Sequence, residues 1–139
     1  MRFSGKVFKD GKNWLAEVPI LDLMTQGTTK KEAYEMVADM IESMVNKEGF
    51  KAGVFKGKNN TFEIGSKETK HLVSLLLQRK REISGLSLSQ VSDRLGVSSR
   101  NAYARYEQGK SAPSMEKLND LFHAVSPNTD IVIGESSVS

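Results

Sequence analysis

Hydrogen-bonding chemistry is concentrated in four consecutive polar residues, Ser98-Ser99-Arg100-Asn101. Hydroxyl, guanidinium and amide groups can pair with the base edges that line the major groove of DNA. Further polar side chains flank these four residues on both sides. The candidate DNA-binding residues are Ser87, Ser98, Ser99, Arg100, Asn101, Tyr103, Arg105 and Lys110.

The spacing around these residues predicts two short helices joined by a tight turn. Ser87 followed by Gln90 is typical of a capping box, and Leu88, Val91 and Leu95 recur on one face of the helix that follows. Gly96 suits the turn, and a serine can cap the second helix. This pattern predicts a helix-turn-helix whose second helix presents its polar first turn to DNA.

Charge is distributed unevenly along a chain whose net charge is +3. Residues 67–110 hold nine Lys or Arg against four Asp or Glu, a local net charge of +5, and the remaining residues are net acidic by two. This asymmetry predicts that only the second half of the chain binds the phosphate groups of DNA, through Arg79, Lys80 and Lys110. The alternative for Arg79-Lys80-Arg81 is a solvated charged helix.

The residue types argue against an enzyme. The chain has no cysteine, and only His71 and His123 offer imidazole groups. A metal-dependent nuclease would need several converging carboxylates, and Asp10, Glu17 and Asp22 are the acids on the early strands and loops. Asp10 and Asp22 fit turn and loop positions. We therefore expect no catalytic residue, no metal and no cofactor.

The first half of the chain alternates as strands do and contains one amphipathic helix. The helix begins after Thr29, with Glu32 completing a capping box, and ends near Asn46. The expected strands cover residues 2–9, 14–18, 24–27, 50–55 and 61–64. The resulting order is βββαβ, with one of the last two strands as an extra hairpin strand.

The second half reads as helical. Helices are expected from residue 67 to about 83, on both sides of Gly96, and after Pro113. The apolar run Ile131-Val132-Ile133 predicts a short strand that pairs with a second copy or docks on its own domain.

With a boundary at Gly65-Ser66, we predict an α+β protein with domains at 1–65 and 67–134 and a tail at 135–139. Without a signal-peptide core or a membrane span, we expect it in the cytoplasm.

Two segments resemble known families. Trp14-Leu15-Ala16-Glu17-Val18-Pro19, followed by Thr25-Gln26-Gly27 and the Glu32-Ala33 helix start, resembles the N-terminal signature of HicB-type antitoxins. Residues 67–126 resemble the Cro/repressor (XRE-type) helix-turn-helix, carried by residues 101–110 and Pro113-Ser114. Leu88 stands where that motif often has a phosphate-contacting Gln. The stretch from Gly96 to Tyr106 is one residue longer than usual, which shifts the expected base contacts by up to one residue.

The resemblance implies a degenerate, partial ribonuclease H-like fold for the first half. It also implies a protein partner, the HicA toxin, a small ribonuclease that cleaves mRNA. Acidic side chains would then cover the basic RNA-binding surface of that toxin. The candidate toxin-binding residues are Glu17, Asp22, Glu32, Glu35 and Asp39, and the alternative for each is an ordinary solvated acid.

The sequence is consistent with three functions. The first is an antitoxin of a type II toxin-antitoxin system that neutralises its toxin and represses its own operon. The second is a transcriptional regulator whose N-terminal domain senses a ligand or dimerises. The third is a metal-dependent nuclease. Because one helix-turn-helix reads only a short half-site, we expect at least a dimer on operator DNA in the first two cases.

Overall fold

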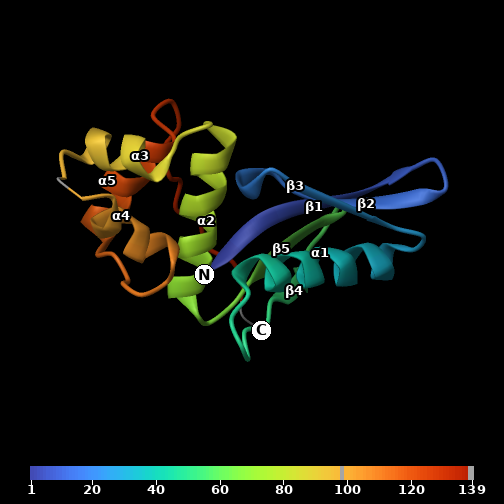
Figure 1. Ribbon diagram of the computed structural model, residues 1–139. Coiled ribbons are helices and arrows are strands. Elements are labelled where there is room, and N and C mark those ends of the chain that lie inside the picture. The colour runs from blue at the N-terminus through green and yellow to red at the C-terminus, as the bar shows by residue number, and fades with distance from the viewer. Residues whose placement is uncertain (98, 138–139) are drawn as a thin grey trace.

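The computed structural model describes residues 1–97 and 99–137, and it has an α+β fold (Figure 1). Five strands form one sheet in the order β3-β2-β1-β5-β4, and every neighbouring pair is antiparallel. The strands are β1 (Arg2–Asp10), β2 (Asn13–Val18), β3 (Leu23–Gly27), β4 (Gly53–Lys56) and β5 (Thr61–Gly65). A 3₁₀ turn, η1 (Pro19–Leu21), joins β2 to β3.

Helix α1 (Lys30–Val45) covers one face of this sheet (Figure 1). Thr29 caps the helix, with its hydroxyl accepting from the amide of Glu32 at 3.0 Å, as predicted. Side chains alternate along the strands, so Phe3 and Val7 of β1 are buried in the core on the face that α1 covers. Within the part of the chain that the structure describes, no α-helix lies over the opposite sheet face, which exposes Phe8, Met24 and Phe55 among others.

Four helices make up the second half: α2 (Thr69–Ile83), α3 (Leu88–Leu95), α4 (Arg100–Glu107) and α5 (Met115–Val125). Figure 1 shows α2 standing between the sheet and the other three helices. Among the described residues, none of the helices combines the length and the apolar character that crossing a membrane demands.

Two clusters of buried residues share α2. The sheet core lies between α1 and the strands, and α2 contributes Leu72, Leu75 and Leu76 to it. The helical core contains Val73, Leu77, Val91, Tyr103, Leu118, Leu121, Ala124 and Val125. Packing therefore crosses the Gly65-Ser66 boundary, because the same helix fills both cores from opposite sides.

The predicted strand at 131–133 is wrong: residues 126–137 contain neither helix nor strand. A three-residue strand depends on ladder bonds to a neighbour. Here the amide of Ile131 donates to Oδ1 of Asp130 instead, at 2.9 Å. Ile131 packs against both cores, whereas Val132 and Ile133 are exposed. The strand expected at 50–55 also starts later, at Gly53, because Phe50 is a buried loop residue.

Candidate nucleic-acid interface

Helix α3 and the turn after it have the local geometry that the sequence predicts. The Ser87 hydroxyl accepts from the Gln90 amide at 3.1 Å, and Oε1 of Gln90 accepts from the Ser87 amide at 2.8 Å. Gly96 ends the helix with φ +72°, in the left-handed region that favours glycine. The Val97 amide then donates to the carbonyl of Ser92 at 3.1 Å, which closes the turn.

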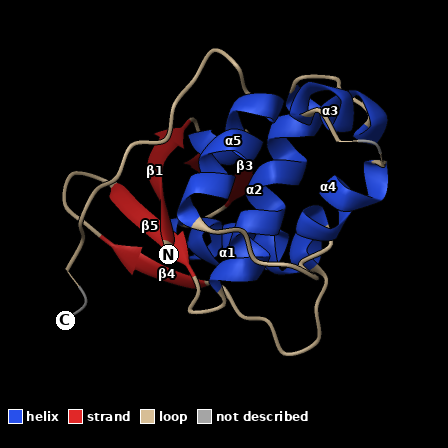
Figure 2. Ribbon diagram, turned by 90° about the vertical axis from the view of Figure 1, so that its left-hand side faces the viewer, coloured by secondary structure: helices blue, strands red, loops and turns tan. Residues whose placement is uncertain are grey.

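Helix α4 presents a polar first turn to solvent. Ser99 caps the helix by accepting from the Asn101 amide at 3.2 Å, and the side chains of Arg100 and Asn101 are exposed. Arg105 is exposed one turn further along, and Lys110 is exposed just after the helix. Figure 2 shows α3 and α4 together on the side of the molecule away from the sheet. Ser98 lies outside the described residues.

The prediction that Tyr103 contacts DNA is wrong, because its side chain is only 1% exposed and belongs to the helical core. Its hydroxyl makes no hydrogen bond of ordinary geometry with the described residues. Burial raises the pKa of Tyr103, and the nearby Glu107 carboxylate raises it further. Tyr103 and Ala104 mark the inner side of α4, so Arg100, Asn101 and Arg105 lie on the outer side.

An ion pair fixes the end of α4 to α2. Nε and Nη2 of Arg81 donate to the two carboxylate oxygens of Glu107 at 2.7 and 3.0 Å, and Nη1 donates to the carbonyl of Leu86 at 3.0 Å. The Glu107 carboxylate hydrogen bond raises the pKa of Arg81. The sequence pattern alone does not predict this pair. One signal was present: Glu107 is the last residue of α4, where the helix dipole disfavours negative charge unless a cation compensates it.

Three of the arginines within the basic segment 67–110 bind groups inside the chain. Arg79 donates to the carbonyls of Leu21 and Asp22, Arg81 binds Glu107, and Arg94 donates to the carbonyl of Ala124. The phosphate contact of Arg79 stays a prediction, and here its guanidinium nitrogens bind Leu21, Asp22 and Glu82. The charge that α4 and its following turn offer to DNA comes from Arg100, Arg105 and Lys110.

The predicted toxin-binding acids do not form one surface. Glu17 lies between the buried Ala16 and Val18, so it points to the uncovered sheet face, away from α1. Three of the acids are exposed on α1, on the opposite side of the sheet: Glu32, Glu35 and Asp39. Asp22 is exposed in the turn between η1 and β3.

Two of these acids also have partners within the chain. The Glu32 carboxylate accepts from the amide and hydroxyl of Thr28 at 3.3 and 3.1 Å, so it serves the start of α1. Oε1 of Glu35 lies 4.0 Å from Nζ of Lys31.

The acids considered for a metal site are far apart along the chain, because Asp10 and Asp22 lie at opposite ends of β2. Within residues 1–97 and 99–137, no three His, Asp or Glu side chains gather as a metal site.

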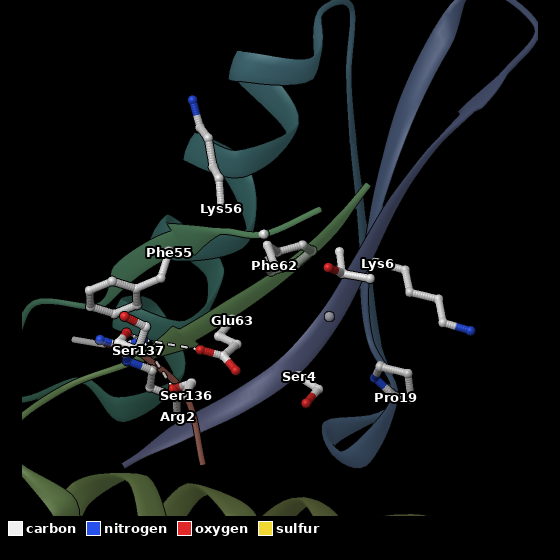
Figure 3. A pocket seen from close by; sticks show the side chains of 13 residues that line it. Arg2, Ser4, Lys6, Pro19, Phe55, Lys56, Phe62, Glu63, Ser136 and Ser137 are labelled. Atoms are coloured by element: carbon white, nitrogen blue, oxygen red, sulfur yellow. Dashed lines mark hydrogen bonds and ion pairs between the residues drawn. The ribbon is translucent and has the colours of Figure 1, made fainter. Parts of the chain in front are cut away.

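The uncovered sheet face contains a hollow of about 680 Å³ (Figure 3). Arg2 lies in it, with Nη1 donating to Glu63 at 3.1 Å and to the Ser136 hydroxyl at 3.2 Å. Its guanidinium also stacks 3.5 Å from the ring centre of Phe55. The C-terminal tail thus borders the hollow and is held to the first strand.

Residues 77–124 match a family model described as a helix-turn-helix, of the Cro/C1 type. The match begins inside α2, spans α3 and α4 and ends in α5. No curated protein matches the chain. The match and the exposed first turn of α4 together support a DNA-binding transcriptional regulator.

Proposed function

We propose that the protein is the antitoxin of a type II toxin-antitoxin system, which represses its own operon through the helix-turn-helix and neutralises an mRNA-cleaving HicA-type toxin through the sheet domain. The observation that carries the DNA-binding part is the exposed Arg100 and Asn101 at the start of a capped α4. The toxin-binding part is supported by the resemblance of the β2–β3–α1 segment to HicB-type antitoxins.

Repression in this proposal is carried out by a homo-oligomer, at least a dimer. One α4 reaches a single half-site in the major groove, and two copies related by a twofold axis read an inverted repeat. The two half-sites would be about one helical turn of DNA apart.

Neutralisation is proposed to be a binding event without catalysis by this chain. A ribonuclease must hold its RNA on a basic surface, and an acidic surface that covers it would block the substrate. The stripe of Glu35 and Asp39 on α1 offers two such acids on one helix face. Asp22 offers a third, separate acid beside α2.

Both activities can be tested with one pair of variants. The full-length chain should bind a fragment of its own promoter, and it should restore growth to cells that express the toxin encoded beside it. Arg100→Ala should weaken specific promoter binding and keep growth rescue. Asp22→Lys with Glu35→Lys should keep promoter binding and lose growth rescue at equal protein levels. Absence of any rescue by the wild-type chain would refute the antitoxin assignment.

A ligand-responsive regulator is the second candidate, and the hollow beside Arg2 favours it. A volume of about 680 Å³ is within the range of small-molecule sites. In that case a cell metabolite would change promoter binding. Ser4→Trp would fill the hollow and remove the response, whereas the antitoxin assignment requires no such response.

A further inference from the structure

Arg79 of α2 binds the turn that connects β2 to β3. Its Nε donates to the carbonyl of Leu21 at 2.9 Å, and its Nη2 donates to the carbonyl of Asp22 at 3.1 Å. Its Nη1 pairs with Glu82 at 3.2 Å. The side chain is 19% exposed, and each of its three nitrogens has an acceptor within the chain.

The turn that Arg79 binds has an unusual backbone. Asp22 adopts φ +51°, in the left-handed region that non-glycine residues seldom occupy, and its amide donates to the carbonyl of Pro19 at 3.0 Å. Leu21 is fully buried in the sheet core. The buried side chain of Leu21 therefore anchors the turn, and Arg79 binds the carbonyl groups of Leu21 and Asp22.

The side chains just beyond these carbonyls are free to meet another molecule. The Asp22 carboxylate is exposed, and Met24, two residues later on the edge strand β3, is 49% exposed. A carboxylate beside a flexible apolar side chain suits a basic protein surface with an apolar spot.

We infer that Arg79 is a positioning residue for partner binding: it holds the turn, and with it Asp22 and Met24, in the conformation that meets the toxin. This inference rests on the proposed antitoxin function. A turn that is ordered before binding loses less conformational entropy on association, which favours the complex. Charge-assisted hydrogen bonds from a guanidinium are well suited to this task.

The test compares Arg79→Ala, Arg79→Lys and the matched control Glu82→Gln in the full-length protein. Amide hydrogen exchange at Asp22 reports the turn without any partner. Arg79→Ala should speed this exchange and weaken binding of the purified toxin about tenfold. Arg79→Lys keeps the charge and should restore part of both. Glu82→Gln leaves both carbonyl bonds and should change neither.

Promoter binding, measured over a range of salt concentrations, separates this role from two others. We expect affinity and salt dependence to stay unchanged in all three variants. A salt slope reduced by about one phosphate in Arg79→Ala would make Arg79 a DNA contact and overturn the inference. Equal losses of melting temperature, toxin binding and promoter binding would make its role merely structural. Unchanged Asp22 exchange would overturn it as well.

Failure of the proposed function is distinguishable from failure of this inference. If the wild-type chain does not bind the toxin, the antitoxin assignment fails, and with it the role of Arg79 in partner binding. The exchange experiment would still decide whether Arg79 holds the turn.

Discussion

Arg81 and Glu107 join α2 to the end of α4 through two hydrogen bonds, at 2.7 and 3.0 Å, and both side chains are largely buried. Glu107 is 8% exposed, so its carboxylate has little contact with water while Arg81 is bound to it. The position of α4, which carries the exposed DNA-facing residues, thus depends on a helix outside the turn motif itself.

Removing one partner of this pair should destabilise the protein strongly. Arg81→Ala would leave the Glu107 carboxylate buried without a cation, which typically costs about 3–5 kcal/mol. Urea denaturation would measure the free energy of unfolding. The exposed pair Lys31–Glu35 is the control, and Glu35→Ala should cost at most about 1 kcal/mol. Similar small losses at both pairs would show that the Arg81–Glu107 pair is solvated.

Tyr103 should make stability decrease at alkaline pH. Unfolding returns its pKa to about 10, whereas burial raises that pKa in the folded state. Above pH of about 10 the unfolded chain releases a proton that the folded chain keeps. The stability is therefore full below that pH and decreases above it, by up to about 1.4 kcal/mol per pH unit. Tyr103→Phe should reduce this slope in urea titrations at pH 9 to 11, and part of the slope should remain because burial also raises the pKa of Tyr34.

Base and phosphate contacts should separate in DNA titrations. Arg100→Ala or Asn101→Ala should weaken specific promoter binding by about 1–3 kcal/mol and leave non-specific binding nearly unchanged. Lys110→Ala should weaken binding to all sequences and reduce the salt slope. Arg94→Ala is a charge-matched control, because its guanidinium binds the carbonyl of Ala124. Promoter affinity equal to wild type in the first two variants would remove α4 as the recognition helix.

The shared helix predicts one cooperative unfolding transition. Leu72 fills the sheet core and Leu77 fills the helical core, and both are fully buried on α2. Leu72→Ala and Leu77→Ala should each cost about 2–5 kcal/mol. Each should shift the same transition, followed by Trp14 fluorescence and by helical circular dichroism. Two separate transitions, each sensitive to one variant, would show that the halves unfold independently.

The same packing changes what is expected of an isolated N-terminal fragment. The boundary at Gly65-Ser66 suggests that residues 1–65 could fold and bind toxin alone. Such a fragment lacks Leu72, Leu75, Leu76 and Phe122, which are buried in the sheet core. We therefore expect residues 1–65 to expose apolar surface and to bind a hydrophobic dye, in contrast to the full chain.

Local signals in the sequence predict the local features well. Ser87 with Gln90, Thr29, and Gly96 each act within a few residues, and their caps and turn form as expected. The Glu32 half of the predicted capping box differs, because its carboxylate accepts from the amide and hydroxyl of Thr28, one residue earlier. These features depend on backbone groups close in sequence, so the neighbouring residues determine them.

Features that depend on distant residues were not predictable in the same way. The contact of Arg79 with Leu21 and the contact of Arg81 with Glu107 join segments that only the tertiary fold brings together. The side of α4 on which Tyr103 lies does not follow from its residue type, because a tyrosine suits both a core and a DNA surface. The strand expected at Ile131 failed because a short apolar run does not specify its neighbour.

Helix α2 also constrains how this protein can acquire a new DNA specificity. A gene fusion that joined α2–α5 to another N-terminal domain would bring along Leu72, Leu75 and Leu76 of α2, which pack against the present sheet. A cut after α2 would instead deprive the transferred helices of Val73 and Leu77, two of the eight buried residues of the helical core. We therefore expect operator recognition in this architecture to diversify by point substitutions in α4, with the two halves inherited together.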